Sequence, residues 1–438
     1  MKSRGAPDGV LDSPRQGRQR ARFARLAALG IGIVLSIPGC ATTAAATDGK
    51  PPLIWHVESN DGKVVDSHES DAPVNPASVV KLATSFRALD TLGVDHRFMT
   101  TFGVVGDGAG KAAQGFVVDG GADPDFHFEN AVLVAHALEE AGVDRVRGDL
   151  YIGDTFWIGW ERGTVGRETD PVKRRTDMAR RLLQAWAPAS WSEDQRSSWS
   201  EVAARRGWDG SKPPSIAIEG RIRTDAPPRW SPVVVHRSEP LLVALRRFNV
   251  FSNNDIERLD ATIGAPSGLS AFLERRLGKD AGMTSFATSS GLNRNRMTPR
   301  LVVQLLRELR AWLVAHGRSP AELMPVLGCG QSTLSELFPR LRASGEADGL
   351  AGKTGTLNLQ DGGVSALAGF LPVGPGVMFF VAAPGAGAAL PRARAAEEDW
   401  VRRVLLKLGS VPPLVCPAAV PTSDGFAEIA GPTRLSKN

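Results

Sequence analysis

The sequence contains few of the residues that mark several common protein classes. Its 438 residues include one tyrosine, three cysteines and seven histidines, and no internal repeat is evident. The histidines and cysteines do not cluster with the spacing of metal ligands, so we expect no metal site and no cofactor. The formal net charge of +5 is small for this length, and an ordinary solvated surface explains it better than binding to an anionic cell-wall or membrane surface does; we expect no nucleic-acid partner. The 42% of hydrophobic residues instead predicts a globular chain of two or three domains.

The N-terminal region lacks an apolar run long enough to cross a bilayer. Several arginines precede the apolar stretch from Leu26 to Ile37, and this pattern predicts a secretory signal peptide within residues 1–46 that is followed by a linker. Its end has two interpretations. Ile37-Pro38-Gly39-Cys40 resembles a lipobox, which would anchor the protein to the membrane through a lipidated Cys40, and Ala44-Ala45-Ala46 offers an ordinary cleavage site. We favour the lipobox, and under both interpretations we expect an exported, periplasmic protein.

Two cysteines remain after this segment, Cys329 and Cys416. An oxidising compartment would permit a disulfide between them, but the sequence alone cannot pair them. We expect two buried free thiols, with the disulfide as the alternative.

Hydrophobic periodicity predicts a mixed α+β organisation. Asn60-Asp61-Gly62 indicates a tight turn between two strands, and apolar residues at helical spacing predict a helix from Ser78 to Leu92. Short strand-like runs begin near Phe98, where we place the start of an inserted α+β domain. The predicted parts are a main domain of residues 51–97 plus 233–411, an insert of residues 98–232 and a loose C-terminal tail of residues 412–438.

Seven of the ten tryptophans lie between Trp157 and Trp230. Exposed indole rings could stack on sugars, but large aromatic side chains are usually buried, so we expect them to belong to the core of the insert.

The chemistry-bearing pattern begins at Ser78-Val79-Val80-Lys81. A serine hydroxyl needs a base to become a nucleophile, and a lysine three residues later lies on the same helical face. The lysine can act only if burial or a neighbouring cation lowers its pKa. This tetrad alone is weak, because chance supplies it often.

Two further motifs follow in order. Ser252-Asn253-Asn254 would place Ser252 and Asn254 in one cleft if the segment is extended, where the serine could pass a proton and the asparagine could hold a substrate amide. Lys353-Thr354-Gly355-Thr356 would form a strand that binds substrate: the lysine could bind a carboxylate, the glycine would admit a peptide, and the N–H of Thr356 could serve an oxyanion hole together with that of Ser78.

The three motifs in this order resemble the penicillin-recognising serine acyltransferases, and more closely the D-alanyl-D-alanine carboxypeptidases of the class C low-molecular-mass type, peptidase family S13. Further similar segments are Pro76-Ala77-Ser78, Gly120 to Asp125, Gly148-Asp149-Leu150, Ser289 to Arg296 and Ser365 to Gly369.

The resemblance implies a penicillin-binding transpeptidase fold, with an antiparallel five-stranded sheet flanked by helices and an inserted α+β domain. It also implies Ser78, Lys81, Ser252 and Asn254 as catalytic residues. The stretch from Trp157 to Trp230 departs from the family, and Asn358 to Gly363 lengthens the loop after the third motif.

The resulting hypothesis is a serine DD-carboxypeptidase or endopeptidase. It would cleave D-alanyl-D-alanine stem peptides of peptidoglycan through a Ser78 acyl-enzyme, with β-lactams as covalent inhibitors. A β-lactamase is disfavoured. The class A β-lactamases that the motifs also resemble use a glutamate, with an asparagine four residues later, to hydrolyse the acyl-enzyme, and no Glu-x-x-x-Asn occurs between Ser252 and Lys353. The alternative from another class is a non-catalytic cell-wall binding or scaffold protein that retains the fold.

Overall fold

The computed structural model describes residues 52–106, 113–159, 168, 170–374, 376–409, 411–420 and 425–430. The predicted signal peptide, the linker and Cys40 lie outside these ranges. Within them, no helix is both long enough and apolar enough to cross a membrane.

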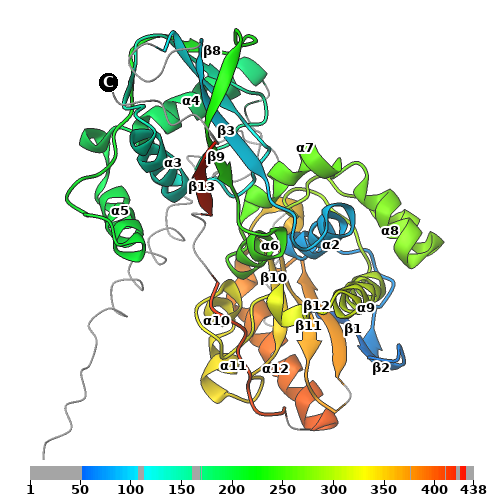
Figure 1. Ribbon diagram of the computed structural model, residues 1–438. Coiled ribbons are helices and arrows are strands. Elements are labelled where there is room, and N and C mark those ends of the chain that lie inside the picture. Colours follow the sequence, from blue (N-terminus) through cyan, green and yellow to red (C-terminus); the bar gives the residue numbers. More distant parts are fainter. Residues whose placement is uncertain are drawn as a thin grey trace, which may run out of the picture. The chain divides into compact units, whose positions relative to one another are not determined.

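A five-stranded antiparallel sheet forms the centre of the main part of the chain (Figure 1), which confirms the predicted fold class. The β1–β2 hairpin turns at Asn60-Asp61-Gly62 as predicted, because Gly62 adopts φ +83° and Ser59 and Lys63 close the turn. In spatial order the strands are β10 (Ala351–Leu357), β11 (Val364–Leu371), β12 (Val377–Pro384), β1 (Ile54–Ser59) and β2 (Val64–His68).

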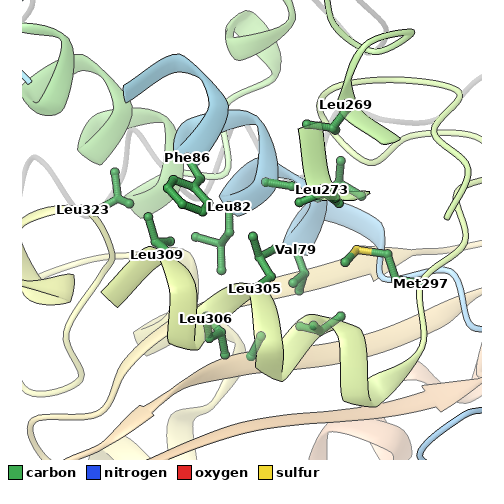
Figure 2. Close-up of a cluster of buried hydrophobic side chains, with 14 of the residues drawn as sticks. Val79, Leu82, Phe86, Leu269, Leu273, Met297, Leu305, Leu306, Leu309 and Leu323 are labelled. Atoms are coloured by element: carbon green, nitrogen blue, oxygen red, sulfur yellow. The ribbon is translucent and has the colours of Figure 1, made fainter. Parts of the chain in front are cut away.

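Helices cover both faces of this sheet, and the alternation of side chains along each strand explains why. In β12, Met378 and Phe380 join the cluster formed with helices α2, α8 and α9, whereas Phe379 and Val381 pack with α12 on the opposite face. Figure 2 shows the first cluster, in which Leu82 and Phe86 of α2 meet leucines of α9. The helices of this part are α2 (Val80–Leu92), α6 (Leu241–Val250), α7 (Asp260–Ile263), α8 (Leu269–Leu277), α9 (Pro299–Ala315), α10 (Thr333–Leu337), α11 (Pro339–Ser344) and α12 (Leu390–Leu408).

A second, six-stranded sheet lies in the segment that follows α2. The pairs β4–β6 and β6–β8 are parallel and the other pairs are antiparallel. Its strands in spatial order are β13 (Phe426–Ile429), β9 (Trp230–Arg237), β3 (Met99–Val105), β4 (Gly115–Asp119), β6 (Asp149–Ile152) and β8 (Ile222–Arg223). The associated elements are α3 (Phe128–Glu140), α4 (Pro171–Ala185), α5 (Glu193–Arg206) and the paired strands β5 (Arg145–Val146) and β7 (Ala217–Ile218).

Most tryptophans of this region are core residues, as expected. Trp186 is fully buried between Phe102 and Phe116, and Trp191 and Trp199 are almost as inaccessible. Trp160 lies outside the described residues. The burial of these indole rings removes them as a stacking platform for sugars.

Two expectations, one about a domain boundary and one about the tail, are wrong. The predicted boundary at residue 232 falls inside β9, where Pro232 sits at a register shift opposite Gly103 and therefore does not end the strand. The tail is not loose along its whole length, because β13 adds to the second sheet beside β9.

The two cysteines are also not free thiols. Cys329 and Cys416 form a disulfide with a Cα–Cα distance of 5.5 Å across a separation of 87 residues. The tail packs against the turn that carries Cys329: a Cβ added to Gly328 would lie 2.7 Å from a methyl group of Leu414. This contact between distant segments brings the two thiols together, and local sequence cannot reveal it.

Candidate active site

Ser78 lies on a 3-10 turn, η1 (Ala77–Val79), directly before α2, and its side chain is half-buried. The predicted helix therefore begins two residues later than expected. Ala77 adopts φ +48°, a left-handed conformation that an α-helix cannot contain. The turn leaves Ser78 half-buried, while α2, whose apolar face is buried in the core, fixes the position of Lys81.

Lys81 is fully buried, and its Nζ donates to Ser78 Oγ at 3.0 Å. It also donates to Asn254 Oδ1 at 3.0 Å and to the carbonyl oxygen of Ser290 at 2.7 Å. Burial lowers the pKa of Lys81 to about 7, although the negative charges of Glu257 and Asp255 act in the opposite direction. A large fraction of Lys81 is therefore neutral near neutral pH, and a neutral amine can accept the proton of Ser78.

The second motif connects α6 to the 3-10 helix η4 (Asn254–Leu259) and is not extended as predicted. Ser252 has φ +53°, and Asn253 caps η4 by accepting from the N–H of Asp255 at 2.8 Å. This bend still brings Ser252 and Asn254 to the same site, where Asn254 contacts Lys81 and Ser252 contacts Lys353.

Lys353 on β10 is the second buried lysine of the site. Its Nζ donates to Ser252 Oγ at 2.9 Å and to the carbonyl oxygen of Thr354 at 2.8 Å. Burial, and then the positive charge of Lys81, lowers the pKa of Lys353 well below its ordinary value. The positive charge of Lys81 thus disfavours the protonated form of Lys353.

The other three residues of the third motif, Thr354, Gly355 and Thr356, each contact a different part of the protein. Gly355 faces the turn of the nucleophile, because a Cβ at this position would lie 2.5 Å from the carbonyl oxygen of Pro76. Thr354 is almost fully buried and donates to Thr333 Oγ1 at 3.2 Å. Thr356 is half-buried and accepts from Arg394 at 3.2 Å. The glycine thus permits the close packing of β10 on η1 within the protein itself.

The sequence did not predict that the segment of Ser289 and Ser290 contacts the site. The carbonyl of Ser290 binds Lys81, and its hydroxyl donates to Glu257. Ser289 donates to Asp260 at 2.5 Å, and burial raises the pKa of Asp260 to about 7. Ser289 to Arg296 resembles a family segment, but the resemblance gave no role for it. The pair of serines before Gly291 was the one pattern in the sequence that could have indicated these contacts.

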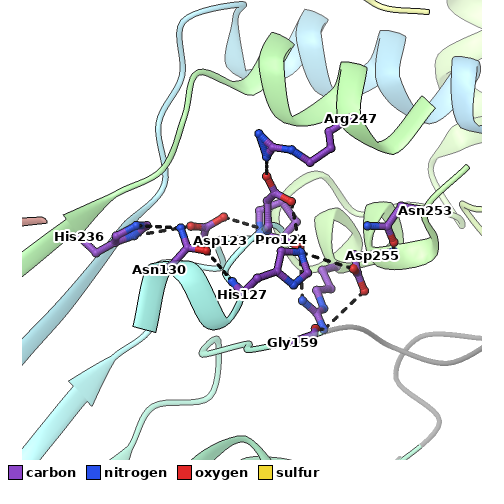
Figure 3. A network of polar contacts seen from close by, with 11 residues as sticks. Asp123, Pro124, His127, Asn130, Gly159, His236, Arg247, Asn253 and Asp255 are labelled. Carbon is purple, nitrogen blue, oxygen red and sulfur yellow. Dashed lines mark hydrogen bonds and ion pairs between the residues drawn. The ribbon is translucent and has the colours of Figure 1, made fainter. Parts of the chain in front are cut away.

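A buried polar network joins the second motif to the inserted segment (Figure 3). Asp255, which follows Asn254, lies 3.8 Å from His127 and 3.5 Å from Arg258. His127 lies 3.3 Å from Asp125, which forms an ion pair with Arg247 of α6. The turn after β4 therefore supports η4 and the asparagine at its start.

This network also holds the carboxyl group of Asp123. His236 of β9 lies 3.8 Å from Asp123 and 3.1 Å from Asn130. Burial, and then the charge of Asp125, raises the pKa of Asp123 to about 7. No group of three or more His, Cys, Asp or Glu side chains in the described ranges is arranged to hold a metal ion.

Known proteins of similar sequence or structure were found for this chain. A D-alanyl-D-alanine carboxypeptidase from Actinomadura sp. (strain R39) is 35% identical over 118 residues, which are 27% of this chain and only 22% of that protein. A predatory endopeptidase from Bdellovibrio bacteriovorus, solved in complex with an immunity protein, has a TM-score of 0.72 at 19% identity and covers 86% of this chain and 99% of its own. A second predatory endopeptidase from that organism, solved as a penicillin G acyl-enzyme, has a TM-score of 0.69 at 19% identity with the same coverage.

At such identities the two structures show a shared fold. The match to a family profile extends over more than half of the chain: residues 53–170 and 214–404 match the D-Ala-D-Ala carboxypeptidase 3 (S13) family. These ranges contain both lysines of the site together with Ser78, Ser252 and Asn254, which they contact. The chain therefore belongs to the D-Ala-D-Ala carboxypeptidase 3 (S13) family.

Proposed function

We propose that the protein is a serine DD-carboxypeptidase or endopeptidase that acts on the D-alanyl-D-alanine stem peptides of peptidoglycan. The observation that carries this proposal is the set of three contacts in which Lys81 bonds Ser78 and Asn254 while Lys353 bonds Ser252. These contacts link a nucleophile to a buried amine and a second hydroxyl to a second buried amine.

In the proposed acylation, neutral Lys81 takes the proton of Ser78 as Oγ attacks the carbonyl carbon of the penultimate D-alanine. The peptide C–N bond breaks, and Ser252 passes a proton to the departing amine and regains one from the lysine network. Water then attacks the ester, which releases the shortened stem peptide and restores the hydroxyl of Ser78. Backbone N–H groups of Ser78 and Thr356 would stabilise the oxyanion in both halves of the reaction.

β-Lactams would acylate Ser78 by the same attack, with the opened ring remaining on the serine. The penicillin G acyl-enzyme of the structural neighbour from Bdellovibrio bacteriovorus supports this part of the proposal. The carboxypeptidase name of the Actinomadura relative and the endopeptidase name of the structural neighbour support the two reaction types that we propose.

A fluorescent penicillin tests the acylation step. We expect covalent labelling of the wild-type protein and none of Ser78→Ala, whereas the exposed Ser200→Ala control should be labelled like the wild type. Intact mass measurement before and after labelling should show one adduct. Labelling of Ser78→Ala would refute the assignment of the nucleophile.

Substrate assays separate the reaction types. Release of D-alanine from a pentapeptide would identify a carboxypeptidase, and conversion of a cross-linked dimer to monomers would identify an endopeptidase. Binding to isolated cell wall without either reaction would instead support the scaffold alternative. We also propose export to the periplasm with a lipid on Cys40, which the intact mass of the protein recovered from a bacterial membrane fraction would test.

A further inference from the structure

The loop between β10 and β11, residues 358–363, reaches back to the turn that carries the nucleophile. Its Asp361 carboxylate accepts two hydrogen bonds from the Arg296 guanidinium, at 2.5 and 2.9 Å, and one from Asn75 Nδ2 at 3.1 Å. The bonds from Arg296, followed by the one from Asn75, lower the pKa of Asp361. The group is therefore a carboxylate near neutral pH, and a carboxylate can only accept hydrogen bonds.

Asn75 is buried and uses both ends of its side-chain amide. Its Nδ2 donates to Asp361 and to the carbonyl oxygen of Asn293, the latter at 2.7 Å, while its Oδ1 accepts from the N–H of Ala77 at 3.0 Å. An acceptor such as the Asp361 carboxylate stabilises only the amide orientation that turns Nδ2 toward it. The same orientation presents Oδ1 to Ala77.

Ala77 is the residue whose backbone needs this support. Its φ of +48° costs a residue with a side chain about 1–2 kcal/mol relative to the right-handed region. The surroundings are shaped to this conformation: a Cβ on Gly291 would lie 1.9 Å from the carbonyl oxygen of Ala77, and one on Gly355 would lie 3.2 Å from its Cβ. Relaxation of Ala77 would rotate the following peptide, which contains the N–H of Ser78.

We propose that Asp361 is a positioning residue for acylation, which acts through Asn75 to hold Ala77 in its left-handed conformation and so orients Ser78. The inference rests on the proposed function, because it concerns the rate at which Ser78 is acylated. Asp361 bonds neither Ser78 nor Lys81 in the contacts described above. Asp361 lies in a loop that departs from the family pattern. Its effect is on the direction of the Ser78 hydroxyl and N–H groups.

The first test measures the second-order acylation rate of Asp361→Ala with a fluorescent penicillin, over the pH range that spans the pKa of Lys81. We expect a loss of about 10- to 100-fold at every pH, since small misplacements of a nucleophile cost rates of this order, with an unchanged pH midpoint. Asp361→Asn keeps an acceptor for Asn75 and should lose less. The matched control is Asp71→Ala, which removes an equally bidentate but exposed pair with Arg300 and should change the rate less than about twofold.

The second test separates positioning from simple stabilisation of a loop. Glycine adopts positive φ as readily as negative φ, so an Ala77→Gly background needs less support from Asn75. We expect Asp361→Ala to cost less than about threefold in that background. Equal losses in both backgrounds, or a loss below twofold in the wild-type background, would overturn the proposal.

Folding is checked by thermal unfolding of each variant. If Asp361→Ala does not fold, Asp361→Asn is tested in both backgrounds with the same criterion. Labelling of the wild-type protein at Ser78 keeps the two proposals distinct. Its absence would refute the proposed function and the positioning role together, whereas normal labelling of the wild type and of Asp361→Ala would refute the positioning role alone.

Discussion

Replacing Glu257 with glutamine is expected to shift the pH dependence of acylation toward lower pH. The proposed acylation requires neutral Lys81, whose pKa of about 7 reflects burial opposed first by the charge of Glu257 and then by that of Asp255. The wild-type rate should therefore rise as the pH increases through about 7. Removing the Glu257 charge removes a force that favours the protonated lysine, so Lys81 should lose its proton at lower pH.

The size of the shift follows from how the two groups are connected. Ser290 lies between them: its carbonyl accepts from Lys81 at 2.7 Å and its hydroxyl donates to Glu257. Two hydrogen bonds of about 3 Å, separated by one residue, place the charges of Lys81 and Glu257 on the order of 7 Å apart. At that distance two unit charges interact by about 2 kcal/mol at an effective dielectric constant of about 20. With about 1.4 kcal/mol for each pKa unit, we expect a shift of about one to one and a half units.

The assay is the second-order acylation rate with a fluorescent penicillin, measured as a function of pH for the wild type, Glu257→Gln and the exposed control Glu274→Gln. The control should keep the wild-type midpoint. A midpoint of Glu257→Gln that stays in place, or that moves to higher pH, would refute the assignment of the titrating group to Lys81.

Three further variants test the packing around the site. Gly355→Ala places a Cβ 2.5 Å from the carbonyl oxygen of Pro76, so it should slow labelling and lower the free energy of unfolding by about 1–3 kcal/mol, as thermal unfolding would measure. Cys416→Ser removes a crosslink across 87 residues, and the chain-entropy model predicts a loss of about 4–5 kcal/mol in urea denaturation under oxidising conditions. Asp125→Asn leaves the buried charge of Arg247 without its carboxylate partner and should cost about 3–5 kcal/mol in the same measurement.

Each of these variants has its own control. Gly282→Ala adds a Cβ with no atom nearer than 3.9 Å and should leave unfolding and labelling unchanged. The wild-type protein with its disulfide reduced should match Cys416→Ser, and a large difference between them would contradict the crosslink as the cause. The exposed pair broken by Asp71→Ala should cost less than about 1 kcal/mol, and a cost equal to that of Asp125→Asn would contradict the role of burial.

The local parts of the site could be predicted from the sequence. Ser78 and Lys81 are three residues apart, and their helical spacing determines that they meet. The third motif is a run of adjacent residues as well, and it predicts Lys353 as a residue of the site. The turn at Asn60-Asp61-Gly62 is equally local, because it depends on residues that are neighbours in the chain.

The remaining contacts depend on segments that are distant in the chain. The bend at Ser252, the carbonyl of Ser290 beside Lys81 and the link from Asp361 through Asn75 to Ala77 arise only when separate segments pack together.

Packing between distant segments also explains why Cys329 pairs with Cys416 and why β13 adds to the second sheet. The amino-acid sequence by itself determined which groups are candidates to carry the chemistry. Only the tertiary structure decided how they are held and what their pKa values become, because burial and long-range contacts set both of these properties.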